Sequence, residues 1–565
     1  MSSEDVRERA AAWIASDVDD QDKADLTALL ADESPEAAAE LADRFARRLS
    51  FGTAGLRGAV AGGPNRMNTA TVTATTAALA RWLLDRDSGA AASGVVVGCD
   101  ARHRSDEFAA QTARVLAGAG IRVHMLPSRE PTPLLAYSIR YLRAAAGVMI
   151  TASHNPAADN GYKLYLSDGA QIVPPADTDI EIAIGAVGPL ADIALAPLDS
   201  PLITRHGDEV MQAYLDAVIA ELGQAPATAA WLRFVYTPLH GVAGRLALRA
   251  FARAGFAAPD VVEAQLEPDP DFPTVRFPNP EEPGALDLAI SRARRSGADL
   301  VIANDPDGDR LAVAIPDPKA PGGYRQLTGD QVGALLGAFL LRRLAAEPGT
   351  VMSQQLVVST VVSGSLLPSI AAAAGAPYAQ TLTGFKWIVR AADRREDMRL
   401  AFGYEEALGY AVTGAVRDKD GISAALAVLS LAAAAWSAGE SLQDAYDKLE
   451  VAHGVHLNAQ VTLRAEATVD VMSRLRAAAP AELAGGPVTS MTDYSGGTWE
   501  LPSADMLSFQ LPGARVVIRP SGTEPKVKAY LEVVELVTGG TLASARQAAA
   551  EKMERLRLAV TDLLA

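Results

Sequence analysis

The length, composition and charge of the chain exclude several classes of protein. Its 565 residues exceed the size at which one hydrophobic core stops growing, so three or four domains are expected. A formal net charge of −17 argues against a nucleic-acid partner, because such partners require basic surfaces. The single cysteine, Cys99, excludes an internal disulfide, and the seven scattered histidines leave no thiolate or imidazole cluster for a structural zinc ion.

The N-terminus and the most apolar segment predict a cytoplasmic protein without a membrane anchor. Residues 1–13 are charged and lack the apolar core of a secretory signal; they are typical of an amphipathic surface helix. Residues 422–438 fall short of the ~20 residues that span a bilayer and contain three serines. We therefore expect a buried helix there, in a protein of the reducing cytoplasm.

Apolar runs that predict buried strands alternate with stretches that predict helices, in three rounds of a β-α-β rhythm. The predicted strands are residues 95–97, 121–126, 146–150, 232–236, 300–303, 356–359 and 400–402. The C-terminal part differs, because the strand-like runs 458–463, 514–518 and 527–534 precede a closing helix over 542–564. The pattern predicts an α/β protein with three similar α/β domains and a C-terminal α+β domain. The expected boundaries are 1–207, 208–324, 325–453 and 454–565.

One polar loop follows a predicted buried strand and reads TASHNPAADNGYK over residues 151–163. Its turn dipeptides are Asn155-Pro156 and Asn160-Gly161. We therefore expect Ser153 and Lys163 to flank one compact loop at a strand end, where open α/β sheets bind ligands. A serine hydroxyl is a weak nucleophile unless a base, a covalent modification or surrounding cationic and N–H donors change its reactivity. A structural cluster of Asx turns remains the alternative.

A second loop, NDPDGDR over residues 304–310, also follows a predicted strand. Asp305, Asp307 and Asp309 can converge on one point, and carboxylate oxygens in that number suit Mg²⁺. A calcium-binding EF-hand is disfavoured, because Arg310 and Pro316 stand where its glycine and glutamate are needed. The alternative is a solvated acidic turn, although three neighbouring carboxylates repel one another without a cation.

Two further loops carry donors that suit a phosphate. RPSGTEPK, residues 519–526, offers an arginine, two hydroxyls, a glycine N–H and a lysine, although the same residues are also good turn formers. FGTAGLR, residues 51–57, places Arg57 on a glycine-rich neck, where on its own it could be an ordinary surface arginine. Neither loop is a GxGxxG or P-loop motif, so a nucleotide site is disfavoured.

Together the four loops supply the parts of a phosphoryl-transfer site: an oxygen nucleophile, a Mg²⁺ site, cations and a phosphate anchor. In this combination the chain resembles the α-D-phosphohexomutase superfamily, which includes phosphoglucomutases and phosphomannomutases. Residues 151–163 match its phosphoserine loop, 304–310 its magnesium loop and 519–526 its phosphate-binding loop. The resemblance covers nearly the whole chain, and it implies mixed sheets in four domains around a central cleft.

The resemblance also implies a reaction. Ser153 would carry a phosphoryl group and would complete a Mg²⁺ site with Asp305, Asp307 and Asp309. The phosphoserine would phosphorylate a glucose or mannose phosphate to a bisphosphate, which returns its other phosphoryl group and so exchanges the 1- and 6-phosphates. A sugar bisphosphate such as glucose 1,6-bisphosphate would be the activator, and a phosphosugar the only expected partner of a monomer or homodimer.

The remaining site residues take their roles from the same resemblance. Arg57 and Lys163 would lie near the transferring phosphate, where one would serve as or support the general base and both would spread charge. His154 would orient Ser153 or cap a turn, and Arg310 would steady the aspartate loop. The residues expected to hold the phosphate that does not react are Arg519, Ser521, Gly522 and Thr523.

The sugar-reading loop departs from the pattern of many hexomutases, GE-x-S-GH. Residues 403–410 read GYEEALGY, so Glu406 matches the glutamate, but Leu408 and Tyr410 replace the serine and the histidine. Together with TGFKWI, which contributes Gly384 and Lys386, this form looks more like the branch that includes phosphopentomutases. The alternatives to a hexose phosphate mutase are therefore a phosphopentomutase, a metal-dependent sugar phosphatase and a catalytically silent binding protein.

Overall fold

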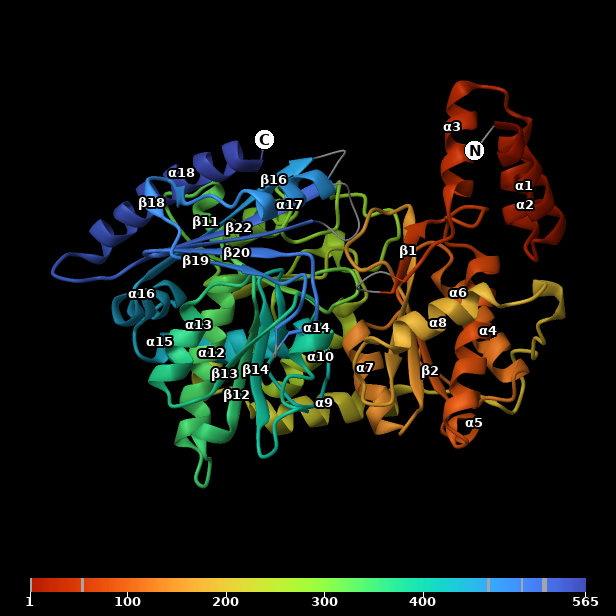
Figure 1. Ribbon diagram of the computed structural model, residues 1–565. Helices are drawn as coiled ribbons and strands as arrows, with labels where there is room; N and C mark the ends of the chain where they lie inside the picture. The colour runs from red at the N-terminus through yellow and green to blue at the C-terminus, as the bar shows by residue number, and fades with distance from the viewer. Residues whose placement is uncertain (1–2, 52–54, 465–467, 499–500, 521–525, 565) are drawn as a thin grey trace. The chain divides into compact units, whose positions relative to one another are not determined.

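The computed structural model describes residues 3–51, 55–464, 468–498, 501–520 and 526–564 (Figure 1). The chain forms two compact units. The first comprises Met1–Ala225, Ala230–Arg325 and Thr413–Leu426, and the second comprises Pro226–Ala229, Gln326–Val412 and Ala427–Ala565.

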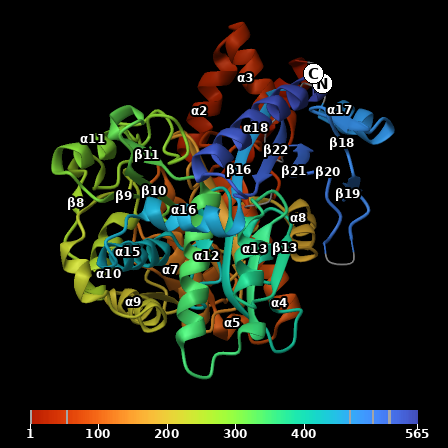
Figure 2. The same ribbon diagram turned by 90° about the vertical axis from the view of Figure 1, so that its left-hand side faces the viewer.

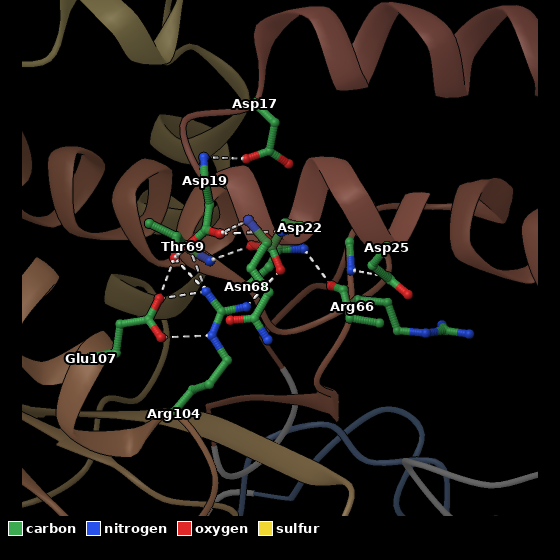
Figure 3. A network of polar contacts seen from close by, with 12 residues as sticks. Asp17, Asp19, Asp22, Asp25, Arg66, Asn68, Thr69, Arg104 and Glu107 are labelled. Carbon is green, nitrogen blue, oxygen red and sulfur yellow. Dashed lines mark hydrogen bonds and ion pairs between the residues drawn. The ribbon is translucent and has the colours of Figure 1, made fainter. Parts of the chain in front are cut away.

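Three helices open the first unit: α1 (Ser3–Ser16), α2 (Asp20–Ala31) and α3 (Pro35–Ala46). Asp19 and Ser34 cap α2 and α3 by accepting hydrogen bonds from first-turn N–H groups. Beneath them, Arg104 donates to Asp22 Oδ1 and to Asp19 Oδ2, both at 2.6 Å, and also pairs with Glu107 (Figure 3). One nearly buried guanidinium thus ties the second helix to the loop that follows strand β2 (Val95–Cys99).

The first sheet has the strand order β1-β5-β4-β2-β3-β6. Its strands are β1 (Leu56–Ala59), β2 (Val95–Cys99), β3 (Val123–Met125), β4 (Ala146–Ile150), β5 (Asp159–Leu166) and β6 (Ile203–Arg205). Strands β4, β2, β3 and β6 run parallel, whereas β5 and β1 pair antiparallel, so the sheet is mixed.

Helices cover both faces of this sheet. Added Cβ atoms on Gly98 and Gly147 would meet Leu135 and Ile139 of α7, so that helix packs on one face. The opposite face carries Val95 and the helices α4, α6 and α8 in one apolar core. The helices of this domain are α4 (Thr69–Arg86), α5 (Ala90–Ser93), α6 (Ser105–Gly118), α7 (Thr132–Tyr141) and α8 (Ala176–Gly185).

The second sheet follows the order β11-β10-β9-β7-β8. Its strands are β7 (Phe234–Thr237), β8 (Asp260–Val261), β9 (Leu300–Asn304), β10 (Leu311–Pro316) and β11 (Tyr324–Gln326). Its helices are α9 (Asp208–Leu222), α10 (Ala243–Ala254) and α11 (Asp287–Ser296). Strands β9 and β10 form an antiparallel hairpin, and the aspartate loop is the turn between them.

The second unit contains a third mixed sheet of order β13-β12-β14-β15. Its strands are β12 (Gln355–Thr360), β13 (Tyr378–Thr381), β14 (Arg399–Glu405) and β15 (Gly409–Ala411). Its helices are α12 (Gly329–Ala346), α13 (Leu366–Ala373), α14 (Phe385–Ile388) and α16 (Leu442–His453), and α15 (Gly421–Ser437) begins in the first unit.

The C-terminal sheet, of order β16-β22-β21-β20-β19, is antiparallel throughout, and α18 packs on its apolar face (Figure 2). Its strands are β16 (Val455–Arg464), β19 (Ser490–Asp493), β20 (Leu507–Leu511), β21 (Ala514–Pro520) and β22 (Lys526–Glu535). The remaining elements are α17 (Thr468–Ala477), the short hairpin β17 (Glu482–Leu483) and β18 (Gly486–Pro487), and α18 (Leu542–Leu564).

These sheets confirm the predicted α/β class with mixed sheets and an α+β C-terminal part. One expectation about the serine loop was wrong: Lys163 does not close a compact loop but lies inside β5, opposite Met149 of β4. Arg57 was likewise expected on a glycine-rich neck, but it lies in a strand, β1, opposite Gly161. Among the described residues no single helix is long and apolar enough to cross a bilayer, although α15 and α16, bent by 88° at their break, pass that test as a pair.

Candidate active site

Ser153 lies in the turn directly after β4 and is 2% exposed. Its backbone has a positive φ of 53°, which is uncommon for a residue with a side chain, and its N–H donates to Thr151 Oγ1 at 2.9 Å. The hydroxyl donates to Asp305 Oδ2 at 2.9 Å and lies 3.1 Å from His154 Nδ1. The turn thus presents the serine oxygen directly to the aspartate loop.

Arg102, which the sequence reasoning missed, fixes the shape of this turn. Its guanidinium donates to the carbonyl oxygens of Ser153 at 2.7 Å and of Asn155 and Pro156 at 2.6 Å each. A fourth bond reaches the carbonyl of Asp159 at 3.0 Å. Arg102 is 4% exposed, so few water molecules can replace these bonds. It follows β2, and a search for polar residues after predicted strands could have found it.

The three aspartates occupy the β9–β10 turn and are buried. One oxygen from each lies within 4.8 Å of the others. Gly308 has a φ of 73°, and an added Cβ would meet Ala243 and Pro131 at 2.9 and 3.0 Å, so only glycine allows this turn. The predicted convergence of Asp305, Asp307 and Asp309 is therefore confirmed.

Two lysines face the aspartates. Lys163 Nζ donates to Asp307 Oδ2 at 2.5 Å and to Asp309 Oδ2 at 2.9 Å. Burial opposes the charge of Lys163, but Asp307 and Asp309 outweigh it and raise its pKa above the usual range. Lys419, which the sequence reasoning did not identify, lies 3.4 Å from Asp309 Oδ2. The lysines balance part of the acidic charge.

The acidic triad fits a divalent metal ion. Within the described part of the chain, Asp307 Oδ1 and Asp309 Oδ1 are buried oxygens without a hydrogen-bond partner. Such atoms are costly unless a cation or a donor meets them. Burial and the two neighbouring carboxylates raise the pKa of Asp305 well above its usual range, because both disfavour its charged form. A bound cation would stabilise that charged form. Oxygen ligands of this kind are those that Mg²⁺ prefers.

The other predicted residues of the first unit lie beside this centre. Arg57 Nη1 donates to Asn155 Oδ1 at 3.3 Å, so it contacts the serine turn. Burial, Arg310 and Arg57 lower the pKa of His154 well below its usual value, so this imidazole is neutral. The backbone N–H of Arg310 donates to Asp305 Oδ1 at 2.9 Å, and its guanidinium reaches Glu281 at 3.0 Å.

All predicted substrate residues except Arg310 belong to the second unit. Glu406 Oε2 accepts from Thr360 Oγ1 and from Ser363 Oγ, both at 3.1 Å. Arg519 of β21 donates to Thr383 Oγ1, and Gly384 has a φ of 110°. Ser521, Gly522 and Thr523 lie outside the described residues.

Three further side chains of this unit lie in the segments predicted to recognise the sugar. Lys386 is 7% exposed, with its ammonium 5.9 Å from the centre of the Trp387 ring. Leu408 and Tyr410 are 1% and 0% exposed. Neither residue that replaces the serine and the histidine of the hexomutase pattern therefore offers an exposed polar group.

Four family models match consecutive parts of the chain. They describe domains I, II and III, each alpha/beta/alpha, and the C-terminal domain of phosphoglucomutase/phosphomannomutase, over residues 48–188, 212–319, 328–451 and 458–545. The helices α1 to α3 precede the first match.

Individual relatives agree with these matches. The chain is 42% identical over 476 residues to a Haemophilus influenzae protein named "Probable phosphomannomutase", covering 82% of this chain and 93% of the relative. It is 33% identical over 568 residues to the human protein named "Phosphopentomutase", covering 94% and 92%. A crystal structure of a phosphoglucomutase/phosphomannomutase family protein from Burkholderia thailandensis has the same fold, with a TM-score of 0.67, 19% identity and coverage of 90% and 97%.

These comparisons define an intramolecular phosphotransferase, an isomerase that moves a phosphoryl group within its substrate. The chain belongs to the phosphoglucomutase/phosphomannomutase family.

Proposed function

We propose that the protein is a Mg²⁺-dependent phosphosugar mutase that interconverts the 1- and 6-phosphates of glucose, mannose or both. One observation carries the proposal: the Ser153 hydroxyl lies 2.9 Å from Asp305 Oδ2, beside two further carboxylates with unpaired oxygens. A phosphoryl group on Ser153 would add about −1.5 to −2 charges beside three acidic side chains. That arrangement needs a cation, and the triad supplies its oxygen ligands.

In the proposed first half-reaction, a free hydroxyl of the sugar phosphate attacks the phosphorus on Ser153. A P–O bond to the sugar forms while the P–O bond to Ser153 Oγ breaks. The serine oxygen gains a proton, and the sugar hydroxyl loses one, so the step balances. The resulting bisphosphate reverses its orientation and returns its other phosphoryl group to Ser153. A free sugar bisphosphate such as glucose 1,6-bisphosphate would load the serine in the same way.

Residues around the serine would carry the charge of the transferring group. When bound, Mg²⁺ would supply positive charge to the phosphoryl oxygens at Asp305, Asp307 and Asp309. Lys163 would stabilise negative charge on the transferring phosphoryl group, because its ammonium lies beside Asp307 and Asp309. Arg57 contacts the same turn and would meet the equatorial oxygens.

The neighbouring imidazole would have a different task. His154 Nδ1 lies 3.1 Å from Ser153 Oγ and would orient that hydroxyl once the phosphoryl group has left. Arg310, whose N–H binds Asp305, would steady the aspartate loop.

The second unit would bind the rest of the substrate. Arg519, with Ser521, Gly522 and Thr523, would hold the phosphate that is not reacting. Glu406 would accept from sugar hydroxyls, because its carboxylate is already held by two hydroxyl donors. Gly384 and Lys386 would contribute to the same subsite.

A pentose phosphate is the second candidate substrate, and one observation favours it. Leu408 and Tyr410 are buried, so the loop that reads the sugar in many hexomutases has lost two polar contacts here. The human relative, which matches 94% of this chain, is named as a phosphopentomutase. The enzyme would then exchange the 1- and 5-phosphates of ribose or deoxyribose by the same serine chemistry.

A substrate panel tests the proposal. Purified protein with Mg²⁺ and the matching bisphosphate is offered glucose 1-phosphate, mannose 1-phosphate and ribose 1-phosphate, and kcat/KM is compared. The highest value for a hexose supports the first candidate, and the highest value for ribose supports the second. Release of inorganic phosphate equal to substrate loss would overturn both and would indicate a phosphatase.

A further inference from the structure

Two histidines that are far apart in the sequence lie side by side at the edge of the first sheet. His124 is on β3, and His206 directly follows β6, its parallel neighbour. Their facing nitrogens, His124 Nδ1 and His206 Nε2, are 3.1 Å apart, and the ring centroids are separated by 5.3 Å. The sequence reasoning found no imidazole cluster because the scattered histidines meet only in the folded sheet.

The outer nitrogen of each ring faces an acceptor. His206 Nδ1 lies 3.1 Å from Glu209 Oε1, and His124 Nε2 lies 3.3 Å from the carbonyl oxygen of Ser93. A neutral imidazole carries one N–H, so donating to these acceptors leaves two lone pairs that face each other across 3.1 Å. The neutral pair therefore cannot satisfy all three contacts.

A cation between the rings would resolve this conflict. A proton shared between the facing nitrogens would satisfy the same three contacts, so binding of Zn²⁺ decides between a proton and a metal ion. Two imidazole ligands of a tetrahedral zinc ion, each at about 2.0–2.1 Å from the metal, have nitrogens roughly 3.3 Å apart. The observed separation of 3.1 Å is close to that value.

The outer contacts are also those of metal ligands. Histidines that bind metals usually donate their other N–H to a carboxylate or a backbone carbonyl, which fixes the ring and the tautomer. Glu209 and Ser93 provide one acceptor of each kind. Imidazole nitrogen suits Zn²⁺ and similar transition metals, whereas Mg²⁺ prefers oxygen, so this pair would not compete with the aspartate triad for Mg²⁺.

We propose that His124 and His206 form a second, transition-metal site of the Zn²⁺ class, with two protein nitrogens as ligands and water in the other positions. The ion would bridge β3 to the turn that joins β6 to α9, because His206 precedes that helix and Glu209 lies in its first turn. It would stabilise the sheet edge without entering the phosphoryl-transfer chemistry, so the inference is independent of the proposed function.

Equilibrium dialysis against Zn²⁺ in excess Mg²⁺ tests the site on the full-length protein. The wild-type protein should bind one more equivalent of Zn²⁺ than His124→Gln or His206→Gln. Glu209→Ala should weaken this binding by about 10- to 100-fold, because it removes the outer acceptor of His206 and leaves both imidazoles in place. The matched control is His103→Gln: this exposed histidine also pairs with a carboxylate, Asp271 at 2.7 Å, and should bind as the wild type does.

Thermal unfolding gives a second readout. Zn²⁺ should raise the Tm of the wild type and of His103→Gln, but not that of the two histidine variants. Circular dichroism and the activity in Mg²⁺ alone report whether each variant folds. Equal Zn²⁺ stoichiometry in the wild type and in folded His206→Gln would overturn the proposal. Should both histidine variants misfold, unchanged Zn²⁺ affinity in folded Glu209→Ala would overturn it as well.

Discussion

Replacing Arg102 tests whether Ser153, the proposed phosphoryl carrier, depends on a positioning residue that binds its backbone and not its hydroxyl. Arg102 donates to four carbonyl oxygens of the serine turn, at distances of 2.6 to 3.0 Å. Arg102→Ala would leave these acceptors and the nearby carboxylate of Asp100 buried without their cation. Arg102→Lys keeps the charge, but a single ammonium with three donors cannot meet four acceptors in this fork geometry.

The structure sets the size of the effect. Removing one partner of a buried, charged network costs about 3–5 kcal/mol, and Arg102 is 4% exposed, so Arg102→Ala should lower the unfolding free energy by that amount. Ser153 holds a positive φ of 53° within this turn. A shift of about 1 Å in a reacting group can cost about 10²-fold in rate, so Arg102→Lys should lower kcat by at least that factor while KM changes less.

Steady-state kinetics and urea unfolding measure the two effects on the same preparations. Arg114→Lys is the matched control, because Arg114 also donates to a backbone carbonyl, that of Ala196, but does not contact the serine turn. It should retain wild-type kcat. A folded Arg102→Lys enzyme with wild-type kcat would refute the positioning role.

Three further predictions follow from single side chains. Burial raises the pKa of Glu130 from 4.5 to about 7, so the folded state binds its proton more tightly and the unfolding free energy falls as pH rises between these values. Glu130→Gln should abolish this pH dependence and raise the unfolding free energy above pH 7 by up to about 3 kcal/mol relative to the wild type. Urea titrations in which the variant keeps the pH dependence of the wild type would contradict the prediction. Lys419→Met should lower kcat by about 10²-fold, since it removes a cation 3.4 Å from Asp309; an unchanged kcat would exclude that role. Arg104→Gln should cost about 3 kcal/mol in urea unfolding, because Asp22 loses its buried partner; unchanged stability would contradict the network in Figure 3.

The strands of the sheets were predictable where they are buried on both faces. Such strands are uninterrupted apolar runs, as in β2 and β4. Strand β5 escaped prediction because Asn160-Gly161 has the composition of a turn. In the structure Gly161 serves a close approach of strands instead: an added Cβ would lie 2.6 Å from the Thr151 carbonyl oxygen and 2.7 Å from that of Leu56.

Some residues of the site were predictable from a local motif, whereas others are brought together only by the fold. The aspartate triad lies within one short turn, so its alternation already predicted the convergence of the carboxylates. Arg102 follows β2, and only the order of strands in the first sheet places it beside the turn after β4. Lys419 directly precedes Asp420 and α15, and its contact with Asp309 joins segments far apart in the sequence that no local pattern connects. His124 and His206 meet for the same reason, across two strands whose pairing no local pattern specifies.

The proposed function requires Ser153 to be the phosphoryl carrier. Intact-mass measurement tests it most directly, before and after incubation with glucose 1,6-bisphosphate and Mg²⁺, with peptide mapping of the modified residue. If Ser153 is the carrier, the wild type gains one phosphoryl group on Ser153, and Ser153→Ala gains none. An unchanged wild-type mass across the bisphosphates of glucose, mannose and ribose, or an equal gain in folded Ser153→Ala, would contradict it.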